Sequence, residues 1–119
     1  MNASEPRRQL MLRLPPSLAE WLHRHSVLEH RTKTEILVEA IGWAQALPTR
    51  ERLRAVPTPS DDPSDERRVV SYRVPKSLHT WCRIEAYPEE WTTNELVTRV
   101  LLAWREHQEQ NPQKPAQER

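Results

Sequence analysis

The sequence has one cysteine and one glycine, and both scarcities exclude kinds of site. Cys82 alone excludes an intramolecular disulfide and is typical of a reducing compartment. Gly42 alone cannot build a glycine-rich loop that cradles a phosphate. His23 and His25 fall on different sides of a helix, no Cys/His cluster completes a metal site, and no nucleophile lies at a useful spacing from a base. The sequence therefore predicts neither catalysis nor a bound metal or other cofactor.

Long apolar runs and a large net charge are also missing. The 119 residues carry a net charge of +1, which by itself favours no particular partner. No stretch is apolar enough to cross a membrane, and no secretory leader is evident. We therefore expect a soluble cytoplasmic protein with no membrane partner and no evident small-molecule ligand. Most of the cationic residues are Arg, which forks to phosphates and guanine edges better than Lys does.

What the sequence does contain is an internal repeat. Residues 7–44 align without a gap on residues 67–104, at an offset of 60 positions. The identical pairs are Arg7/Arg67, Arg8/Arg68, Arg13/Arg73, Pro15/Pro75, Ser17/Ser77, Leu18/Leu78, Trp21/Trp81, Glu29/Glu89, Thr32/Thr92 and Glu35/Glu95. A unit that occurs only twice predicts a paired module rather than a solenoid. Neither copy alone can bury much apolar surface, so we expect the two copies to share one core.

Each copy opens with a short segment in which apolar and other residues alternate. The side chains expected on the inner face are Leu10, Leu12, Leu14, Val70, Tyr72 and Val74. Those expected on the outer face are Gln9, Met11, Arg13, Val69, Ser71 and Arg73. Alternation that stops at Pro15 or Pro75 predicts one strand in each copy, with one buried face.

After each strand the hydrophobic period becomes helical, and two helices are predicted. The apolar stripe of the first helix is Leu18, Trp21, Leu22 and Leu28, matched in the second copy by Leu78, Trp81 and Cys82. Pro88 is expected to end the first helix of the second copy early. The second helix begins in each copy at a capping-box sequence, in which Thr and Glu satisfy each other's backbone donors. These sequences are Thr32-Lys-Thr-Glu35 and Thr92-Thr-Asn-Glu95. Trp104 on the last helix is expected in the core.

Composition divides the chain into modules and connecting segments. The two repeat modules are expected at residues 7–47 and 67–107. Residues 48–66 are rich in Pro and acidic side chains, which predicts an extended linker with no element of its own. Residues 108–119 form a Gln/Pro-rich tail with little to bury, which we expect to be disordered.

A strand, a helix and a capped helix, written twice, resemble the ribbon-helix-helix family of DNA-binding proteins, the Arc/MetJ/CopG type. The motifs are the strand ends Arg13-Leu14-Pro15 and Arg73-Val74-Pro75, and the segment His30-Arg31-Thr32-Lys33-Thr34-Glu35. The family usually has Gly-Arg-Ser-x-Ser-Glu there, and the second copy, Glu90-Trp91-Thr92-Thr93-Asn94-Glu95, is looser. The resemblance implies a mostly α fold with a short antiparallel β-ribbon, in which two βαα modules form an intramolecular pseudo-dimer. The tandem arrangement is similar to that of conjugation accessory proteins of the TraY type.

One departure from the family concerns the glycine between the two helices. His30 and Glu90 replace it, and a left-handed backbone at a non-glycine residue costs about 1 kcal/mol. The resemblance therefore implies a small strain at the same point of both copies.

In that family the paired strands enter the major groove, so the resemblance implies that the outer face reads bases. Gln9 can bond adenine through two groups, while Arg13 and Arg73 can fork to guanine. Met11 and Val69 can contact a thymine methyl, and Ser71 completes the set of outward residues. The competing interpretation is that this face of the sheet is merely solvated. Exposed apolar side chains are poor choices for that purpose.

The resemblance also implies that the starts of the capped helices hold backbone phosphates, because free N–H groups and the positive helix end attract anions. The residues concerned are Arg31, Thr32, Lys33 and Thr34 in the first copy, and Thr92, Thr93 and Asn94 in the second. Glu89 and Glu90 precede the second start and would repel phosphate. Flanking phosphates are within the expected reach of Arg7, Arg8, Arg67 and Arg68, although these could equally be ordinary charged ends.

Three roles follow from the resemblance. The first is sequence-specific binding of double-stranded DNA, most simply by a transcriptional repressor in the bacterial cytoplasm and nucleoid, with further copies possible on adjacent subsites. The second is an accessory protein of plasmid transfer or partition. The third is an antitoxin or protein-interaction scaffold. Because the two strands differ, we expect one chain to recognise a non-palindromic subsite, unless strands pair between chains.

Overall fold

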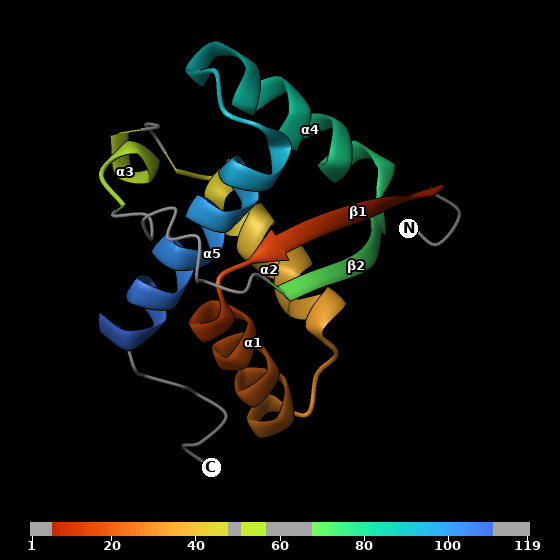
Figure 1. Ribbon diagram of the computed structural model, residues 1–119, viewed down its shortest axis with the longest axis vertical. Coiled ribbons are helices and arrows are strands. Elements are labelled where there is room, and N and C mark those ends of the chain that lie inside the picture. The colour runs from red at the N-terminus through yellow and green to blue at the C-terminus, as the bar shows by residue number, and fades with distance from the viewer. Residues whose placement is uncertain (1–5, 48–50, 57–67, 111–119) are drawn as a thin grey trace.

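The computed structural model describes residues 6–47, 51–56 and 68–110. The elements are strand β1 (Arg7–Leu14), helices α1 (Pro16–Glu29), α2 (Lys33–Gln45) and α3 (Glu51–Arg54), strand β2 (Arg68–Pro75), helix α4 (Lys76–Ala86), the 3-10 helix η2 (Tyr87–Glu89) and helix α5 (Thr93–Gln110). Figure 1 shows that this part of the chain is mostly helical around one two-stranded sheet. The expected class, mostly α with a short antiparallel β-ribbon, is confirmed at this level.

The sheet pairs the two halves of the chain. β1 and β2 run antiparallel, with a register from Arg7 opposite Pro75 to Leu14 opposite Arg68. A lone strand would leave its backbone N–H and C=O groups without partners, so neither half can keep its strand by itself. In this structure the strands therefore pair within one chain.

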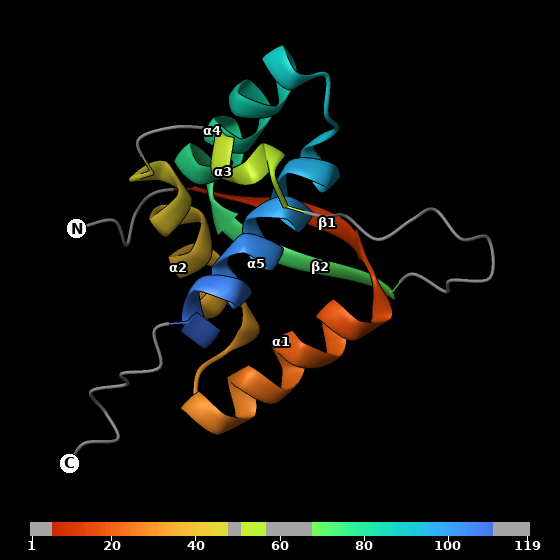
Figure 2. The ribbon, with the colours of Figure 1, turned by 90° about the vertical axis from the view of Figure 1, so that its left-hand side faces the viewer.

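One face of the ribbon lies against the core. Leu10, Leu12 and Leu14 are at most 3% exposed and Val74 is fully buried, as alternation predicts. Two of the inner residues of β2, Val70 and Tyr72, are only partly buried. Figure 2 shows α2 and α5 side by side against one face of the ribbon, with α1 and α4 at opposite ends of the molecule.

The two halves contribute to a single hydrophobic core. Its largest members from the long helices are Ile36, Leu37 and Ile41 of α2, and Leu96, Leu101 and Trp104 of α5. Trp104 is 2% exposed, which confirms its expected place in the core. Trp21 and Trp81 are only partly buried and pack at the margin of that core. The expectation of one shared core is confirmed for the described residues.

Leu28 was expected on the buried stripe of the first helix, and this is wrong because its side chain is 76% exposed. The buried stripe of α1 is formed by Leu18, Leu22 and Ser26, which are spaced four residues apart. Leu28 follows Leu22 by six residues and so lies well off that stripe, since a helix turns every 3.6 residues or so. Val27, the residue before Leu28 in α1, is also exposed.

The first helix ends in the same way in both halves. His30 and Glu90 have φ values of 55° and 63°, in the left-handed region. After His30, the N–H of Arg31 donates to the carbonyl of Ser26 at 3.0 Å, and after Glu90 the N–H of Trp91 donates to the carbonyl of Ala86 at 3.1 Å. This six-residue bond satisfies a carbonyl that the helix end leaves open. As expected, Pro88 shortens the second copy: α4 stops at Ala86 and the last turn becomes η2.

The segment between the modules differs from the extended linker expected for residues 48–66. Residues 51–56 contain the short helix α3, with Leu53 4% and Val56 8% exposed. These apolar side chains let a mostly polar segment dock on the body of the protein. The remainder of that linker lies outside the described residues.

The C-terminal tail was expected to begin at residue 108. Instead α5 continues to Gln110, because Gln and Glu are good helix formers and extend the last turn. Residues 111–119 of the expected tail lie outside the described residues.

Candidate nucleic-acid interface

The six residues expected to face outward form three rows across the ribbon. Gln9 lies opposite Arg73, Met11 opposite Ser71, and Arg13 opposite Val69. All six are exposed, and the two apolar ones, Met11 and Val69, are 60% and 59% exposed. The structure therefore brings together on one face side chains from the two strands, and the partners in each row are between 56 and 64 positions apart in the sequence.

The pairing is symmetric about its central row. Met11 and Ser71 occupy equivalent positions of the repeat and lie directly opposite each other. The rows on either side, Gln9 with Arg73 and Arg13 with Val69, are likewise equivalent to each other under the 60-residue offset. The backbone of the ribbon is therefore pseudo-symmetric, while its side chains are different at the two ends.

Two hydrogen bonds organise one end of this face. The Gln9 side-chain amide donates to the Ser71 hydroxyl at 2.6 Å, and the Arg7 guanidinium donates to the carbonyl of Arg73 at 3.0 Å. The first bond uses one N–H of Gln9 and leaves its amide oxygen and second N–H for another partner. A paired oxygen and N–H are what adenine requires in the major groove.

The start of α2 has the expected capping box. The N–H of Thr32 donates to the Glu35 carboxylate at 2.9 Å, and the N–H of Glu35 donates to the Thr32 hydroxyl oxygen at 3.0 Å. The backbone N–H groups of the following helical residues, Lys33 and Thr34, point out of the helix end, as first-turn donors do. Arg7 and Pro75 border the same surface hollow as Thr32 and Thr34, so the ribbon and this helix start are neighbours.

Arg31, the other residue expected to bind phosphate at this helix start, is turned toward α2 itself. Its guanidinium forms an ion pair with Glu39 and donates to the carbonyl of Glu35 at 3.4 Å. Part of its charge is therefore neutralised within the module. Of the two cations at this helix start, Lys33 is thus the better candidate for a phosphate contact.

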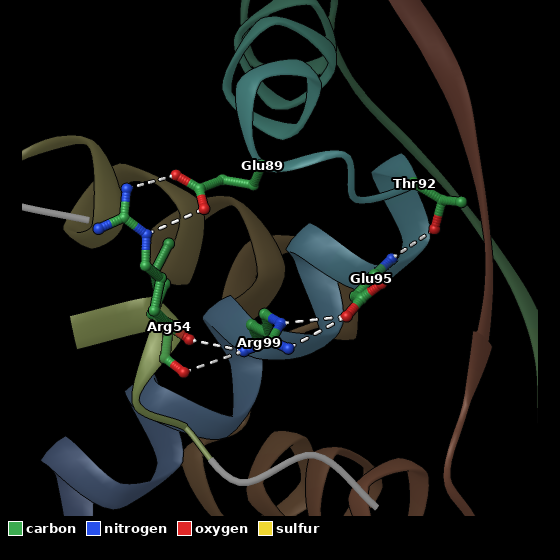
Figure 3. Close-up of polar contacts among 6 residues, drawn as sticks. Arg54, Glu89, Thr92, Glu95 and Arg99 are labelled. Carbon is green, nitrogen blue, oxygen red and sulfur yellow. Dashed lines mark hydrogen bonds and ion pairs between the residues drawn. The ribbon is translucent and has the colours of Figure 1, made fainter. Parts of the chain in front are cut away.

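The start of α5 is built differently. The N–H of Glu95 donates to the Thr92 hydroxyl at 3.0 Å, so Thr92 caps the helix as Thr32 does (Figure 3). The side chain of Asn94 accepts a bond from the N–H of Arg13 at 2.7 Å and donates to the carbonyl of Arg13 at 3.4 Å. Asn94, expected to bind phosphate, thus fastens the first turn of α5 to the edge of β1. Thr93, the first residue of α5, is partly buried.

A residue of α3 neutralises one of the acids beside this second helix start. Arg54 donates two hydrogen bonds to the carboxylate of Glu89, at 2.9 and 2.7 Å (Figure 3). This pairing raises the pKa of Arg54, because the Glu89 carboxylate both accepts its bonds and attracts its charge. No local pattern indicates this role of Arg54, since the contact joins residues 35 positions apart. The second acid, Glu90, is exposed.

Arg99 holds α3 in place. Its guanidinium donates to the carbonyls of Leu53 and Arg54 at 3.0 and 3.4 Å, and to the Glu95 carboxylate at 3.1 Å. It also lies 4.4 Å from the centre of the Trp91 ring, within range of a cation–π contact. A cation at the carbonyl end of a helix is favourable, so Arg99 fastens α3 to α5.

The remaining arginines flank the ribbon at opposite ends. Arg7 and Arg8 are exposed at one end and lie opposite Pro75 and Val74, and Arg68 is exposed at the other end, opposite Leu14. Arg67 lies outside the described residues. Across the parts of the chain that the structure describes, no three His, Cys, Asp or Glu side chains are grouped as a metal site needs, and no helix is long and apolar enough to span a membrane. Burial raises the pKa of the Cys82 thiol to about 12, so it is a poor nucleophile.

The candidate interface combines three features. Its elements are the outward face of the ribbon, two capped helix starts beside the ribbon, and arginines at the ribbon ends. Comparison with protein-family models, with curated proteins and with solved structures found no significant match to this chain.

Proposed function

We propose that this chain is a tandem ribbon-helix-helix protein, in which the two repeats form an intramolecular pseudo-dimer that binds double-stranded DNA in a sequence-specific manner. Two features support the pseudo-dimer. The ribbon register is centred on the equivalent residues Met11 and Ser71, as it would be between two identical subunits. The turns at His30 and Glu90 also share one left-handed geometry, although neither residue favours it.

The observation that carries the proposal is the composition of the ribbon's outward face. It exposes two arginines at equivalent positions and a glutamine whose amide can form further hydrogen bonds. It also exposes two large apolar side chains, Met11 and Val69, whose contact with water is unfavourable. Arginine, glutamine and a methyl-contacting apolar group are the side chains that distinguish guanine, adenine and thymine in the major groove. A two-stranded ribbon also has the width that the major groove admits.

The helix starts supply the proposed backbone contacts. Phosphates would accept bonds from the first-turn N–H groups of α2 and α5, which lie beside opposite edges of the ribbon. The Thr32 and Thr92 hydroxyls already accept bonds from the helix, yet each can still donate its own proton to a phosphate. Phosphate contacts of this type fix register and orientation, and the ribbon then reads the sequence.

The simplest biological role is a transcriptional repressor, and an accessory role at a plasmid transfer or partition origin uses the same interface. A protein-binding role, as an antitoxin or scaffold, has one specific observation in its favour. Ile84 and Tyr87, on α4 and η2, are 60% and 84% exposed and border a shallow apolar hollow. This role would leave the chemistry of the ribbon face unused, which is why we favour DNA binding.

The test is selection of bound duplexes from a random double-stranded library at near-physiological salt, followed by sequencing. We expect an asymmetric motif, because the two ends of the ribbon present Gln9 with Arg73 and Arg13 with Val69. A palindromic motif would instead indicate two chains around a dyad. No enrichment, with binding lost at moderate salt, would leave only phosphate attraction and would favour the scaffold role.

A further inference from the structure

Helix α4 carries a row of cationic or titratable side chains beside the start of β1. Lys76, His79 and Arg83 are spaced three and four residues apart, which places them on one face of the helix. The backbone N–H of Lys76 donates to the carbonyl of Pro6 at 2.9 Å, so the start of α4 is fixed against the residue that precedes β1. Arg8, the second residue of β1, is near enough to His79 to act on its charge, and α4 packs against β1.

The charges at this corner act on one another. The pKa of His79 is lowered first by burial, and then by repulsion from Arg83 and Arg8. These two arginines come from α4 and β1, so both elements place a positive charge near the His79 imidazole. The ion pairs between described residues join Arg24 to Glu20, Arg31 to Glu39, Arg54 to Glu89 and Arg99 to Glu95, and none involves Arg8, Lys76 or Arg83. Glu85, the acid of α4, lies beyond Arg83 at the far end of the helix.

Helix α1 of the first repeat lacks this row, although the corresponding corner has Arg68, the equivalent of Arg8, and Lys33 beside one hollow. At the positions equivalent to Lys76, His79 and Arg83 it has Pro16, Ala19 and His23. On α1 the neighbouring Arg24 is paired with Glu20 at 3.7 Å. The row on α4 is therefore not a requirement of the shared fold, since the other copy folds without it.

This corner lies at the end of the ribbon that already has the stronger phosphate-binding candidates. α4 begins directly after Pro75, and Pro75 borders the hollow shared by Arg7 and the start of α2. At the opposite end, Glu90 stands exposed before the start of α5, and Arg54 is engaged with Glu89. Lys76 and Arg83 thus add exposed cations to this end of the ribbon, while Lys33 and Arg68 border a separate hollow with Glu20 beside the other end.

We propose that Lys76 and Arg83 of α4, together with Arg8, form a further phosphate-binding surface that holds the DNA backbone on one flank of the site. This inference rests on the proposed DNA-binding function. A cationic face of this kind contacts phosphates without reading bases, so it adds affinity evenly over all sequences. Because only one repeat has it, it also fixes which way the protein lies on an asymmetric site.

The test compares full-length wild-type protein with the variant Lys76→Gln/Arg83→Gln on the duplex recovered by selection. Two lost phosphate contacts should reduce the slope of log affinity against log salt by about 2, with the preferred motif unchanged. The matched control is Arg24→Gln/Arg105→Gln, which removes the same net charge from exposed or partly exposed sites on α1 and on α5, well beyond its first turns. This control should keep the wild-type slope, and thermal unfolding verifies that both variants are folded.

A second readout uses the length of the duplex. Trimming the base pairs on one flank of the motif should weaken wild-type binding more than trimming the other flank, and Lys76→Gln/Arg83→Gln should abolish that difference. An unchanged slope and equal flanks, with the motif still selected, would overturn the inference and leave the proposed function standing. A wild-type protein that shows no sequence preference would overturn the proposed function, and the inference with it.

Discussion

His30 and Glu90 hold a left-handed backbone at equivalent points of the two repeats, in positions where glycine would be unstrained. Nearby, the equivalent pairs Arg31 with Glu39 and Trp91 with Arg99 are also in contact, by an ion pair in one copy and a cation–π contact in the other. The same pair of equivalent positions is therefore in contact in both repeats, but the type of interaction differs between them. Divergence of this kind is what makes the two ends of the interface unequal.

The two strained positions allow a matched comparison. His30→Gly and Glu90→Gly should each raise the free energy of unfolding by up to about 1 kcal/mol, because each relieves a positive φ at a residue with a Cβ. Urea unfolding measures this. Only Glu90→Gly removes a carboxylate beside the start of α5, so only it should strengthen DNA binding at low salt. Equal effects of the two variants on DNA affinity would contradict the assignment of that helix start as a phosphate site.

Short-range features of the sequence were enough to predict the residues of the ribbon face, because alternation and a proline stop depend only on neighbours. Long-range contacts were not predictable in this way. Asn94 bonds to the backbone of Arg13 from 81 positions away, and Arg54 neutralises Glu89 from a segment whose composition indicates a linker. Both contacts depend on how elements pack, and no local pattern encodes them.

At the scale of elements, the capping boxes and prolines predicted helix boundaries well. The Thr32–Glu35 box begins α2, and Pro88 shortens α4 and produces η2. α3 was missed because it has four residues and two apolar anchors within a Pro-rich acidic segment. Its formation depends on tertiary support from Arg99 and the core, rather than on helix propensity.

If α3 is a docked part of the fold, removing its buried anchor should be costly. Leu53→Ala should lower the free energy of unfolding by roughly 2–3 kcal/mol, in the lower part of the range for buried leucines because a short surface helix can readjust. Arg52→Ala, at an exposed site on the same helix, is the control. Leaving aside the lost contact with the Trp43 ring, it should lower the free energy of unfolding by less than about 0.5 kcal/mol. Equal and negligible costs in urea unfolding would show that this segment is only a linker.

At the scale of the whole molecule, duplication and strand pairing explain each other. A strand of eight residues cannot persist alone, and one chain that carries two copies supplies both strands and a common core. The internal repeat predicted this pairing, and the register then follows from placing equivalent residues opposite each other. The acids before the second helix start were visible in the sequence, but the contributions of α4 and α3 to the charge around the ribbon were not, because they depend on where these helices pack.

The central claim is that the outward face of the ribbon reads bases, and single substitutions of its two equivalent arginines test it most directly. Their rows are four residues apart along the ribbon, roughly 13 Å, which corresponds to about four base pairs of DNA. We would measure the affinities of Arg13→Ala and Arg73→Ala for the selected duplex and for every single-base change in it. Each variant should lose about 1–3 kcal/mol of discrimination at one position, with the two affected positions roughly four base pairs apart. If both variants instead weaken binding evenly on all sequences, the arginines hold only phosphates and the ribbon does not read DNA.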